Sequence, residues 1–383
     1  MKKKLLFING HLNTGGVEKS LLDILTHLDY DRYDVDLLLT EHLGDYAPQL
    51  PSQVNVLLRS IEGTYGPVPK VLAQSVRRRD WFSFKMRLIF VIMKLFGQKR
   101  IVLAERLLTG GKVYDYAIGF RPGLCTQIAA FAVRADRRIT WWHHGEMNAE
   151  PEIYPEAAAA CDAVVAVSDS CRDMLAGAFP ALAEKLTVIP NMLDADAVRR
   201  QGEASYPYAD RSMTHIVSVG RLAPEKHFEN AIYAARQLKD RGIAFRWHLV
   251  GDGALREELE EKANAFDVTD CFVFEGNRVN PYPYMKHADL FVHPSHVESF
   301  GIVAAEALAL GIPCVVTRSS GVLDFLRDGE NALLAAQSAS DLSEKVTQAL
   351  CDDVLRARLR ENARCPEQFH PAAVMEKINE LLI

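Results

Sequence analysis

The sequence has no apolar segment long enough to span a membrane as a helix. Its longest apolar stretch, Leu88 to Phe96, is interrupted by Lys94, and a membrane span needs about 20 consecutive apolar residues. The seven cysteines are odd in number and never stand in C-x-x-C spacing. This excludes a zinc-ribbon pattern and a disulfide framework, and it is typical of a reduced, cytoplasmic protein.

The chain also has no overall excess of positive charge. Its 383 residues carry a formal net charge of −6, and 49% of them are hydrophobic. This composition excludes an intrinsically disordered or low-complexity chain, and the length predicts two or three domains. Binding to nucleic acid is not expected, because proteins with that function usually present a strongly basic domain.

Residues 70–106 depart from this balance, because they contain ten lysines and arginines but only two acidic residues. Aromatic and aliphatic side chains, Trp81 and Phe90 among them, stand between these cations. Such a segment is typical of an amphipathic surface that lies on anionic lipid; the alternative is a solvated helix face packed on its own domain. We predict that the segment binds an anionic membrane surface, which would make the protein peripheral at the inner face of the cell membrane.

Short apolar runs alternate with stretches of helical periodicity along the chain. This alternation predicts parallel sheets connected by crossover helices. It is interrupted at residues 190–212, which contain proline, glycine and several charges without a clear period, and we interpret this segment as the interdomain linker. The expected fold class is therefore α/β with two tandem Rossmann-like domains, residues 1–190 and residues 191–370, that face each other across a cleft.

In such sheets ligands bind beyond the carboxyl ends of the strands, so a functional motif is expected directly after a strand. The first motif that meets this condition is Asn13-Thr14-Gly15-Gly16, between an expected strand and an expected helix. Gly15 and Gly16 either let a phosphate or a sugar approach the N–H groups at the start of the helix or only make a tight turn. Short glycine motifs are weak signals, and both interpretations stay open at this point.

The second motif, Trp142-His143-His144-Gly145, follows an expected strand at residues 138–142. Paired histidines can bind a metal ion, but no matching set of ligands stands nearby in the sequence. An imidazole that forms hydrogen bonds or transfers protons in a cleft is the favoured interpretation. The alternative is a structural histidine whose hydrogen bonds are satisfied.

The third motif contains two cations, Arg221 and Lys226, after an expected strand at residues 214–220. The guanidinium fork and the point charge of the ammonium suit the two phosphates of a diphosphate. Two cations at the start of a helix oppose the helix dipole, which favours an anionic ligand over a merely solvated turn.

The fourth motif contains two carboxylates, Glu298 and Glu306, after an expected strand at residues 289–293. Glu298 lies in the loop and would point into the ligand site, whereas Glu306 lies about two helical turns later and could accept hydrogen bonds from a diol. Glu306 stands in an otherwise apolar helix, where a carboxylate is rarely buried without a partner. The backbone N–H groups between the two could hold a phosphate at the positive end of the helix; they belong to Phe300, Gly301 and Ile302.

Together these motifs resemble those of the family 4 retaining glycosyltransferases, which have the GT-B fold. The resemblance rests on the E-x7-E pair, on Gly220-Arg221 with Lys226, and on Val188-Ile189-Pro190-Asn191. It is strong over residues 186–336 and weaker over residues 1–185. It implies that the C-terminal domain holds a nucleotide-sugar and that the N-terminal domain binds the acceptor.

The resemblance also implies roles for individual residues. Arg221 and Lys226 would bind the diphosphate. Glu298 would contact the donor sugar, and Glu306 would bind the ribose hydroxyls. Gly15 and Gly16 would lie beside the phosphates, and Asn277 to Val279 would lie near the base. His143, which the strand register favours over His144, would lie at the reacting face of the donor sugar.

Two further features concern the final helix and one departure from the family. A final helix at residues 371–383 is implied to pack back on the N-terminal domain. The chain departs from the family at His227, where a glycine usually follows the lysine.

The implied activity is the transfer of a hexose, with retention, from a nucleotide-sugar to a glycan or a lipid-linked acceptor in cell-surface polysaccharide synthesis, with UDP the more usual nucleotide. The departing phosphate would take the proton of the acceptor, so no metal cofactor is expected. We interpret two Asp-x-Asp strings, at residues 34–36 and 194–196, as structural. The alternatives are a sugar-nucleotide epimerase of similar fold and a non-catalytic, membrane-associated sugar-nucleotide-binding protein; the E-x7-E pair with the two cations argues against both.

Overall fold

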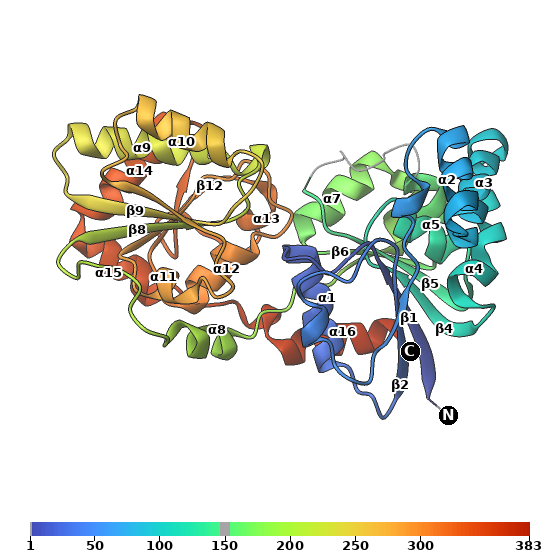
Figure 1. The fold of residues 1–383 in the computed structure, drawn as a ribbon. Helices are drawn as coiled ribbons and strands as arrows, with labels where there is room; N and C mark the ends of the chain where they lie inside the picture. Colours follow the sequence, from blue (N-terminus) through green and yellow to red (C-terminus); the bar gives the residue numbers. More distant parts are fainter. Residues whose placement is uncertain (1, 146–153) are drawn as a thin grey trace. The chain divides into compact units, whose positions relative to one another are not determined.

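A computed structural model describes residues 2–145 and 154–383 of the chain. They form two α/β units, each built around its own parallel sheet (Figure 1). Unit 1 contains residues up to 192 together with residues 374–383, and unit 2 contains residues 193–373. The predicted fold class, α/β with two Rossmann-like domains, is confirmed. The roles predicted for the two domains, and the cleft between them, stay predictions.

The sheet of unit 1 has seven strands in the order β3-β2-β1-β4-β5-β6-β7. Most of them are runs of consecutive buried residues, which is the pattern of a parallel sheet covered on both faces. The exceptions are the two edge strands, β3 and β7, which contain no fully buried residue, and sequence reasoning missed β3. The strands are β1 (Lys3–Asn9), β2 (Tyr33–Leu39), β3 (Asn55–Leu58), β4 (Val113–Gly119), β5 (Arg134–Trp142), β6 (Ala163–Ala166) and β7 (Leu186–Val188).

Eight α-helices of unit 1 lie in the described residues. They are α1 (Gly16–His27), α2 (Val68–Arg78), α3 (Trp81–Phe96), α4 (Glu105–Thr109), α5 (Leu124–Phe131), α6 (Tyr154–Ala159), α7 (Asp169–Ala178) and α16 (Pro371–Leu381). Most of the basic segment therefore forms α2 and α3 (Figure 1). The C-terminal end of the chain is fastened to unit 1, because Lys3 Nζ donates to the carbonyl of Leu382 at 3.0 Å and the Tyr116 hydroxyl donates to that of Ile383 at 2.8 Å.

The sheet of unit 2 has six strands in the order β10-β9-β8-β11-β12-β13. They are β8 (Thr214–Val219), β9 (Phe245–Val250), β10 (Phe272–Gly276), β11 (Leu290–His293), β12 (Cys314–Thr317) and β13 (Leu333–Ala335). The α-helices are α8 (Ala195–Gly202), α9 (Phe228–Asp240), α10 (Arg256–Ala265), α11 (Tyr282–Lys286), α12 (Ile302–Ala309), α13 (Ser320–Leu323), α14 (Ala339–Cys351) and α15 (Asp353–Asn362). Its hydrophobic core includes side chains from β8, β9 and α9, such as Trp247 and Phe228.

Residues 190–212, which we interpret as the interdomain linker, contain the helix α8 although the sequence shows no clear period there. The side chain of Asp194 begins this helix by accepting the N–H of Ala197 at 2.8 Å, and Arg199 Nε donates to the carbonyl of Ala309 in α12 at 2.9 Å. Only Val198 and Gly202 of the helix are buried. Two buried positions are too few to produce a clear apolar period, and the helix was therefore not predicted from the sequence.

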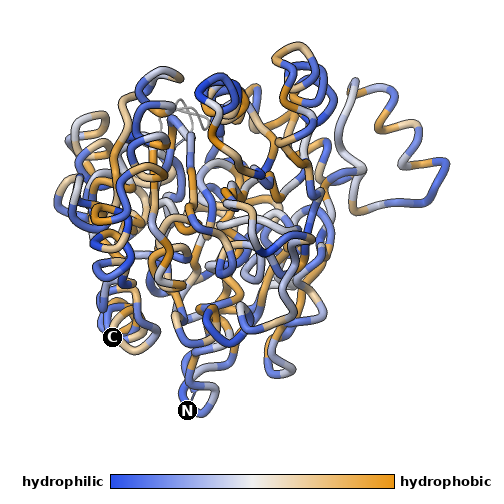
Figure 2. Tube along the Cα trace, turned by 90° about the vertical axis from the view of Figure 1, so that its left-hand side faces the viewer, coloured by the Kyte–Doolittle hydropathy of each residue, from blue (hydrophilic) through white to orange (hydrophobic). Residues whose placement is uncertain are grey.

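Hydrophobic and hydrophilic stretches alternate along the chain (Figure 2). Within the part of the chain that the structure describes, no helix combines the length and the apolar character needed to cross a membrane.

Candidate functional site

The predicted binding residues of unit 2 lie at the carboxyl ends of its central strands. Arg221 follows β8, and Lys226 ends a short 3-10 turn, Pro224–Lys226, that precedes α9. Glu298 lies in the loop that joins β11 to α12. Since β8 and β11 are hydrogen-bonded neighbours in the sheet, their ends meet, and residues far apart in the sequence come together.

A buried carboxylate lies at the centre of this site. Glu298 Oε1 accepts from Lys226 Nζ and from His293 Nε2, each at 2.6 Å. Burial opposes ionisation of Glu298, whose side chain is 12% exposed, but Lys226 and His293 outweigh this effect and hold its pKa well below its usual range. Glu298 is therefore ionised at neutral pH. Sequence reasoning missed His293, because as the last residue of a buried strand it shows no motif.

This ion pair joins two residues to which the sequence assigns separate roles. The sequence predicts Lys226 for the diphosphate and Glu298 for the donor sugar, and the structure joins them in one ion pair. Arg221 is 74% exposed and pairs with Glu225 at 2.9 Å. Since exposed ion pairs contribute little stability, Arg221 can exchange this carboxylate for another anion at small cost.

The second carboxylate of the motif lies inside unit 2. Glu306 occupies the second turn of α12, is buried, and accepts from the Tyr282 hydroxyl at 2.7 Å. The sequence-based expectation of a partner for this carboxylate is met by a phenol from α11. Tyr282 was not predicted, because the spacing of 24 residues to Glu306 gives no local signal.

The start of α12 requires glycine. Gly301 has φ of 80° and precedes the first helical residue, and a Cβ there would lie 2.5 Å from Val322 Cγ1. The backbone N–H groups of Phe300, Gly301 and Ile302, which are predicted to bind phosphate, stand at this end of the helix. Within the described residues none of the three donates a hydrogen bond. They are thus available to an anion at the positive end of the helix.

Asn277 and Val279 follow β10, two strands away from β8 in the sheet. Both are exposed, and Val279 is 100% exposed. The neighbouring Arg278 pairs with Glu275 at 3.0 Å. The predicted contact of this loop with a base stays a prediction.

The glycine motif of unit 1 lies between β1 and α1, as predicted. The structure adds a steric role for Gly15, and its predicted contact with a phosphate stays a prediction. Its φ of −176° is extended backbone that any residue adopts. A Cβ on Gly15 would lie 2.4 Å from Glu18 Oε2, and Glu18 is buried next to Arg121, with 3.2 Å between Glu18 Oε1 and the guanidinium. Gly15 therefore makes room for a carboxylate of its own helix, and Gly16 is the first residue of α1.

The predicted histidines follow β5. His143 is buried and packs against Phe120, with 4.7 Å between ring centroids, and its Nε2 has no hydrogen-bond partner within the described part of the chain. Burial, with smaller contributions from His144 and Arg121, lowers the pKa of His143 to about 3. The ring is therefore neutral at physiological pH, and its unpartnered nitrogen can exchange a hydrogen bond with a ligand. Burial and Arg121 also lower the pKa of His144.

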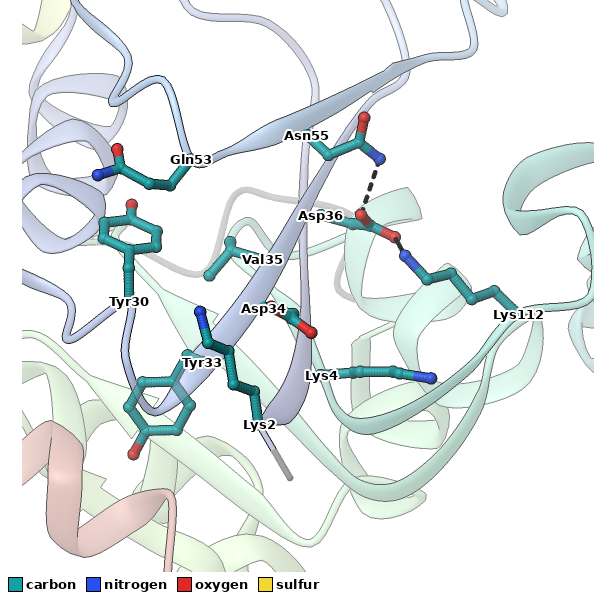
Figure 3. A pocket seen from close by; sticks show the side chains of 10 residues that line it. All are labelled: Lys2, Lys4, Tyr30, Tyr33, Asp34, Val35, Asp36, Gln53, Asn55 and Lys112. Atoms are coloured by element: carbon teal, nitrogen blue, oxygen red, sulfur yellow. Dashed lines mark hydrogen bonds and ion pairs between the residues drawn. The ribbon is translucent and has the colours of Figure 1, made fainter.

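A cavity of about 430 Å³ lies elsewhere in unit 1, beside the N-terminal parts of β1 and β2 (Figure 3). Asp36, from the first Asp-x-Asp string, points to Asn55 and Lys112 in this cavity, at 2.8 and 2.6 Å, and also accepts from the Tyr114 hydroxyl. Asp36 is thus engaged in structural contacts. The cavity lies at the amino-terminal ends of the strands, whereas the motifs follow their carboxyl ends.

Glu41, His42 and Glu62 form a cluster in unit 1 whose potential metal-ligand atoms lie within 4.8 Å of one another. His42 Nδ1 is 3.0 Å from Glu62 Oε1, and its Nε2 is 3.1 Å from Asn13 Oδ1. Both ring nitrogens already have protein partners, so we assign no metal site here.

Residues 210–365 match the family model of the "Glycosyl transferases group 1". The lipopolysaccharide core biosynthesis glycosyltransferase LpsE of Rhizobium meliloti (strain 1021) is 34% identical over 170 residues, which are 44% of this chain and 49% of LpsE. The 2-deoxystreptamine N-acetyl-D-glucosaminyltransferase of Niallia circulans is 28% identical over 189 residues, 47% of this chain and 48% of that protein. The chain thus spans about half the length of the curated relatives it matches.

The fold extends over more of the chain than the sequence matches do. The crystal structure of HepE from Anabaena in complex with UDP and glucose has a TM-score of 0.70 at 20% identity and covers 99% of both chains. At this identity the likeness shows the fold alone. Residues 210–365 are therefore similar to the group 1 glycosyl transferases, and the chain has the GT-B fold.

Proposed function

We propose that the protein is a retaining glycosyltransferase that moves a hexose from a nucleotide-sugar to a glycan or a lipid-linked acceptor in cell-surface polysaccharide synthesis. A UDP-sugar is the favoured donor. The observation that carries the proposal is the part-buried pair of Lys226 with Glu298, the latter standing just before the start of α12. The relatives add support, since LpsE is named for lipopolysaccharide core biosynthesis and HepE is described with UDP and glucose.

The proposed donor site uses groups that unit 2 already holds in place. The exposed guanidinium of Arg221, the ammonium of Lys226 and the N–H groups at the start of α12 would bind the diphosphate. Glu306, oriented by the Tyr282 hydroxyl, would accept hydrogen bonds from the ribose. Asn277 and Val279 would contact the base from the loop after β10.

In the proposed reaction the bond between the sugar and the diphosphate breaks, and the diphosphate gains negative charge. Lys226 and the N–H groups of α12 are oriented before the reaction, which is the condition for strong electrostatic stabilisation; loss of one such donor typically costs about 100- to 1,000-fold in rate. The departing phosphate would take the proton of the acceptor hydroxyl, while His143 would exchange a hydrogen bond with the donor sugar. We propose that no metal ion is needed, because the two cations supply the positive charge at the diphosphate.

We also propose that the protein is cytoplasmic and binds an anionic membrane surface through residues 70–106. The end of α3 exposes large apolar side chains, with Leu95 69% and Phe96 68% exposed, and Lys94 stands beside them. Apolar side chains inserted at the interface and cations near anionic headgroups would act together. The test is co-sedimentation with phosphatidylglycerol vesicles at low salt. Binding by the native chain, and weaker binding of the double variant Leu95→Asp/Phe96→Asp, is expected, and absence of binding by the native chain refutes this part.

The activity is tested by incubating the full chain with a panel of UDP- and GDP-sugars, without acceptor, and measuring nucleotide release and the fate of the sugar. Slow hydrolysis of one donor is expected, since water can replace the acceptor. Recovery of an isomerised nucleotide-sugar would support the epimerase instead. Binding without any turnover, once candidate acceptors are added, would support the non-catalytic alternative.

The residue assignment has its own test with a matched control. Arg221→Ala and Glu306→Gln should each lower turnover by about 100-fold or more, as expected for lost oriented groups. Arg360→Ala removes an exposed guanidinium from α15 and should leave turnover unchanged. A folded Glu306→Gln variant with most of its activity intact would contradict the assignment.

A further inference from the structure

Two histidine rings stack beside the Lys226–Glu298 pair. The ring centroids of His227 and His296 are 3.5 Å apart, and the ring planes meet at 18°. His227 follows Lys226 directly, and His296 stands two residues before Glu298. The stack therefore joins the two loops that carry the members of the ion pair.

Hydrogen bonds join the same two loops. The N–H of His296 donates to the carbonyl of Glu225 at 3.1 Å, and the Ser295 hydroxyl lies 3.2 Å from that carbonyl. From the other side, Gln337 Nε2 donates to the carbonyl of His296 at 3.0 Å. The main chain around His296 is thus held firmly, and its ring is the part that can respond to a change of charge.

The backbone of His227 ends the 3-10 turn in a left-handed conformation. Its φ of 48° and ψ of 43° lie in the left-handed region, which costs a residue with a Cβ roughly 1–2 kcal/mol. Glycine would adopt this conformation without strain. A strained residue persists where the surrounding structure compensates for it. His227 donates its backbone N–H to the carbonyl of Pro224 at 3.2 Å, its ring stacks on His296, and its Nδ1 lies 3.2 Å from Glu229 Oε1.

The hydrogen-bond partners indicate which ring nitrogens carry a proton. His296 Nε2 lies 3.3 Å from the amide nitrogen Nδ2 of Asn230, which can only donate, so this ring nitrogen accepts and His296 is neutral. His227 Nδ1 faces a carboxylate oxygen of Glu229, so it carries a proton. A second proton on His296 would set its Nε2 and the Asn230 amide nitrogen against each other as two donors.

The charged groups around the pair favour this arrangement. Burial lowers the pKa of His296, His227 lowers it further, and Glu229 of α9 acts in the opposite direction. The other charged groups are Glu225 and Lys226 of the 3-10 turn and Glu298 of the His296 loop. Because the pKa is lowered in the folded state, the stabilisation by the stack is present above the ordinary histidine pKa and is lost as the pH falls through the lowered value.

We propose that the stacked pair positions Lys226 against Glu298 and releases this alignment when His296 becomes protonated, so that the site loses affinity for a nucleoside diphosphate on acidification. His227 and His296 are positioning residues that act through the ion pair. The ligand in this inference rests on the proposed function, whereas the titration of the pair does not.

The first test measures UDP affinity of the full chain from about pH 7.5 down to about pH 4.5, because the pKa of His296 is lowered from the ordinary histidine value of about 6.5. The variant His296→Phe keeps an aromatic face for the stack but cannot be protonated. UDP affinity of the native chain should fall more steeply with acidification than that of His296→Phe, and comparison at equal pH cancels the ionisation of UDP itself. The control His27→Phe removes an exposed histidine from α1 and should follow the native profile. Superimposable profiles of the native chain and His296→Phe would overturn the inference.

The second test needs no ligand. Histidine Cε1–H resonances report the titration of His296 in the native chain and in His227→Gly, which accepts the positive φ without strain. The midpoint of His296 should move up towards the ordinary value near about 6.5 when the facing ring is removed, and an unchanged midpoint would refute the pairing. If the native chain binds neither UDP nor GDP at any pH, the proposed donor is wrong, while this titration still decides whether the two rings are coupled.

Discussion

Replacement of Gly301 by alanine is expected to lower the free energy of unfolding of unit 2 by about 1–5 kcal/mol. The left-handed conformation, with φ of 80°, contributes roughly 1–2 kcal/mol of strain to an alanine. The new Cβ would lie 2.5 Å from Val322 Cγ1, and overpacking of a core contact costs about 1–3 kcal/mol. The lower entropy of the unfolded alanine variant offsets about 0.4–1 kcal/mol of this.

The assay is urea-induced unfolding of the full chain, with a control that separates strain from steric overlap. Gly311 has φ of 73° but nothing within 4 Å of its Cβ position, so Gly311→Ala should show the strain alone. In the double variant Gly301→Ala/Val322→Ala the overlap is removed, and the two substitutions should be less than additive in cost. If Gly301→Ala is no more destabilising than Gly311→Ala, the steric reasoning is wrong.

Three further predictions concern named contacts. Because the pKa of Glu298 is lowered, its pairing stabilises the fold at pH values above the ordinary carboxyl pKa, and this stabilisation is lost as the pH falls through the lowered value. The free energy of unfolding of Glu298→Gln should therefore decline less steeply than that of the native chain between about pH 5 and about pH 3. Tyr282→Phe removes a donor to buried Glu306 and should cost about 1–3 kcal/mol in urea unfolding, and a change below experimental error would count against this contact. Asp36→Ala leaves the buried hydroxyl of Tyr114 without this acceptor and should lower the unfolding free energy of unit 1 by about 1–3 kcal/mol without affecting UDP affinity; a change in UDP affinity would mean that the cavity beside Asp36 is linked to the donor site.

The order of strands and helices could be read from the sequence where buried segments are continuous. β9 and β12 have the predicted bounds, because Phe245–Val250 ends at Gly251 and Cys314–Thr317 lies between Pro313 and Arg318. The pattern failed for β3 and α8, which bury too few side chains to show a period.

The candidate site shows the same division. Arg221, Lys226 and Glu298 could be found because each follows a strand, and the carboxyl ends of parallel strands are where ligands bind. Their partners could not be found, because His293 and Tyr282 lie in segments that look purely structural. The reason for Gly15 was also hidden, since it depends on where the buried carboxylate of Glu18 lies.

The sequence by itself therefore determined the α/β class and the loops that carry charged and glycine-rich motifs, because both depend on local periodicity and on the residues directly after a strand. Only the tertiary structure decided that Lys226 meets Glu298, since that contact depends on β8 and β11 being neighbours in the sheet although 72 residues separate the two side chains. The stack of His227 on His296 has the same origin. Strand order is set by the packing of a whole unit, and no local stretch of sequence contains it.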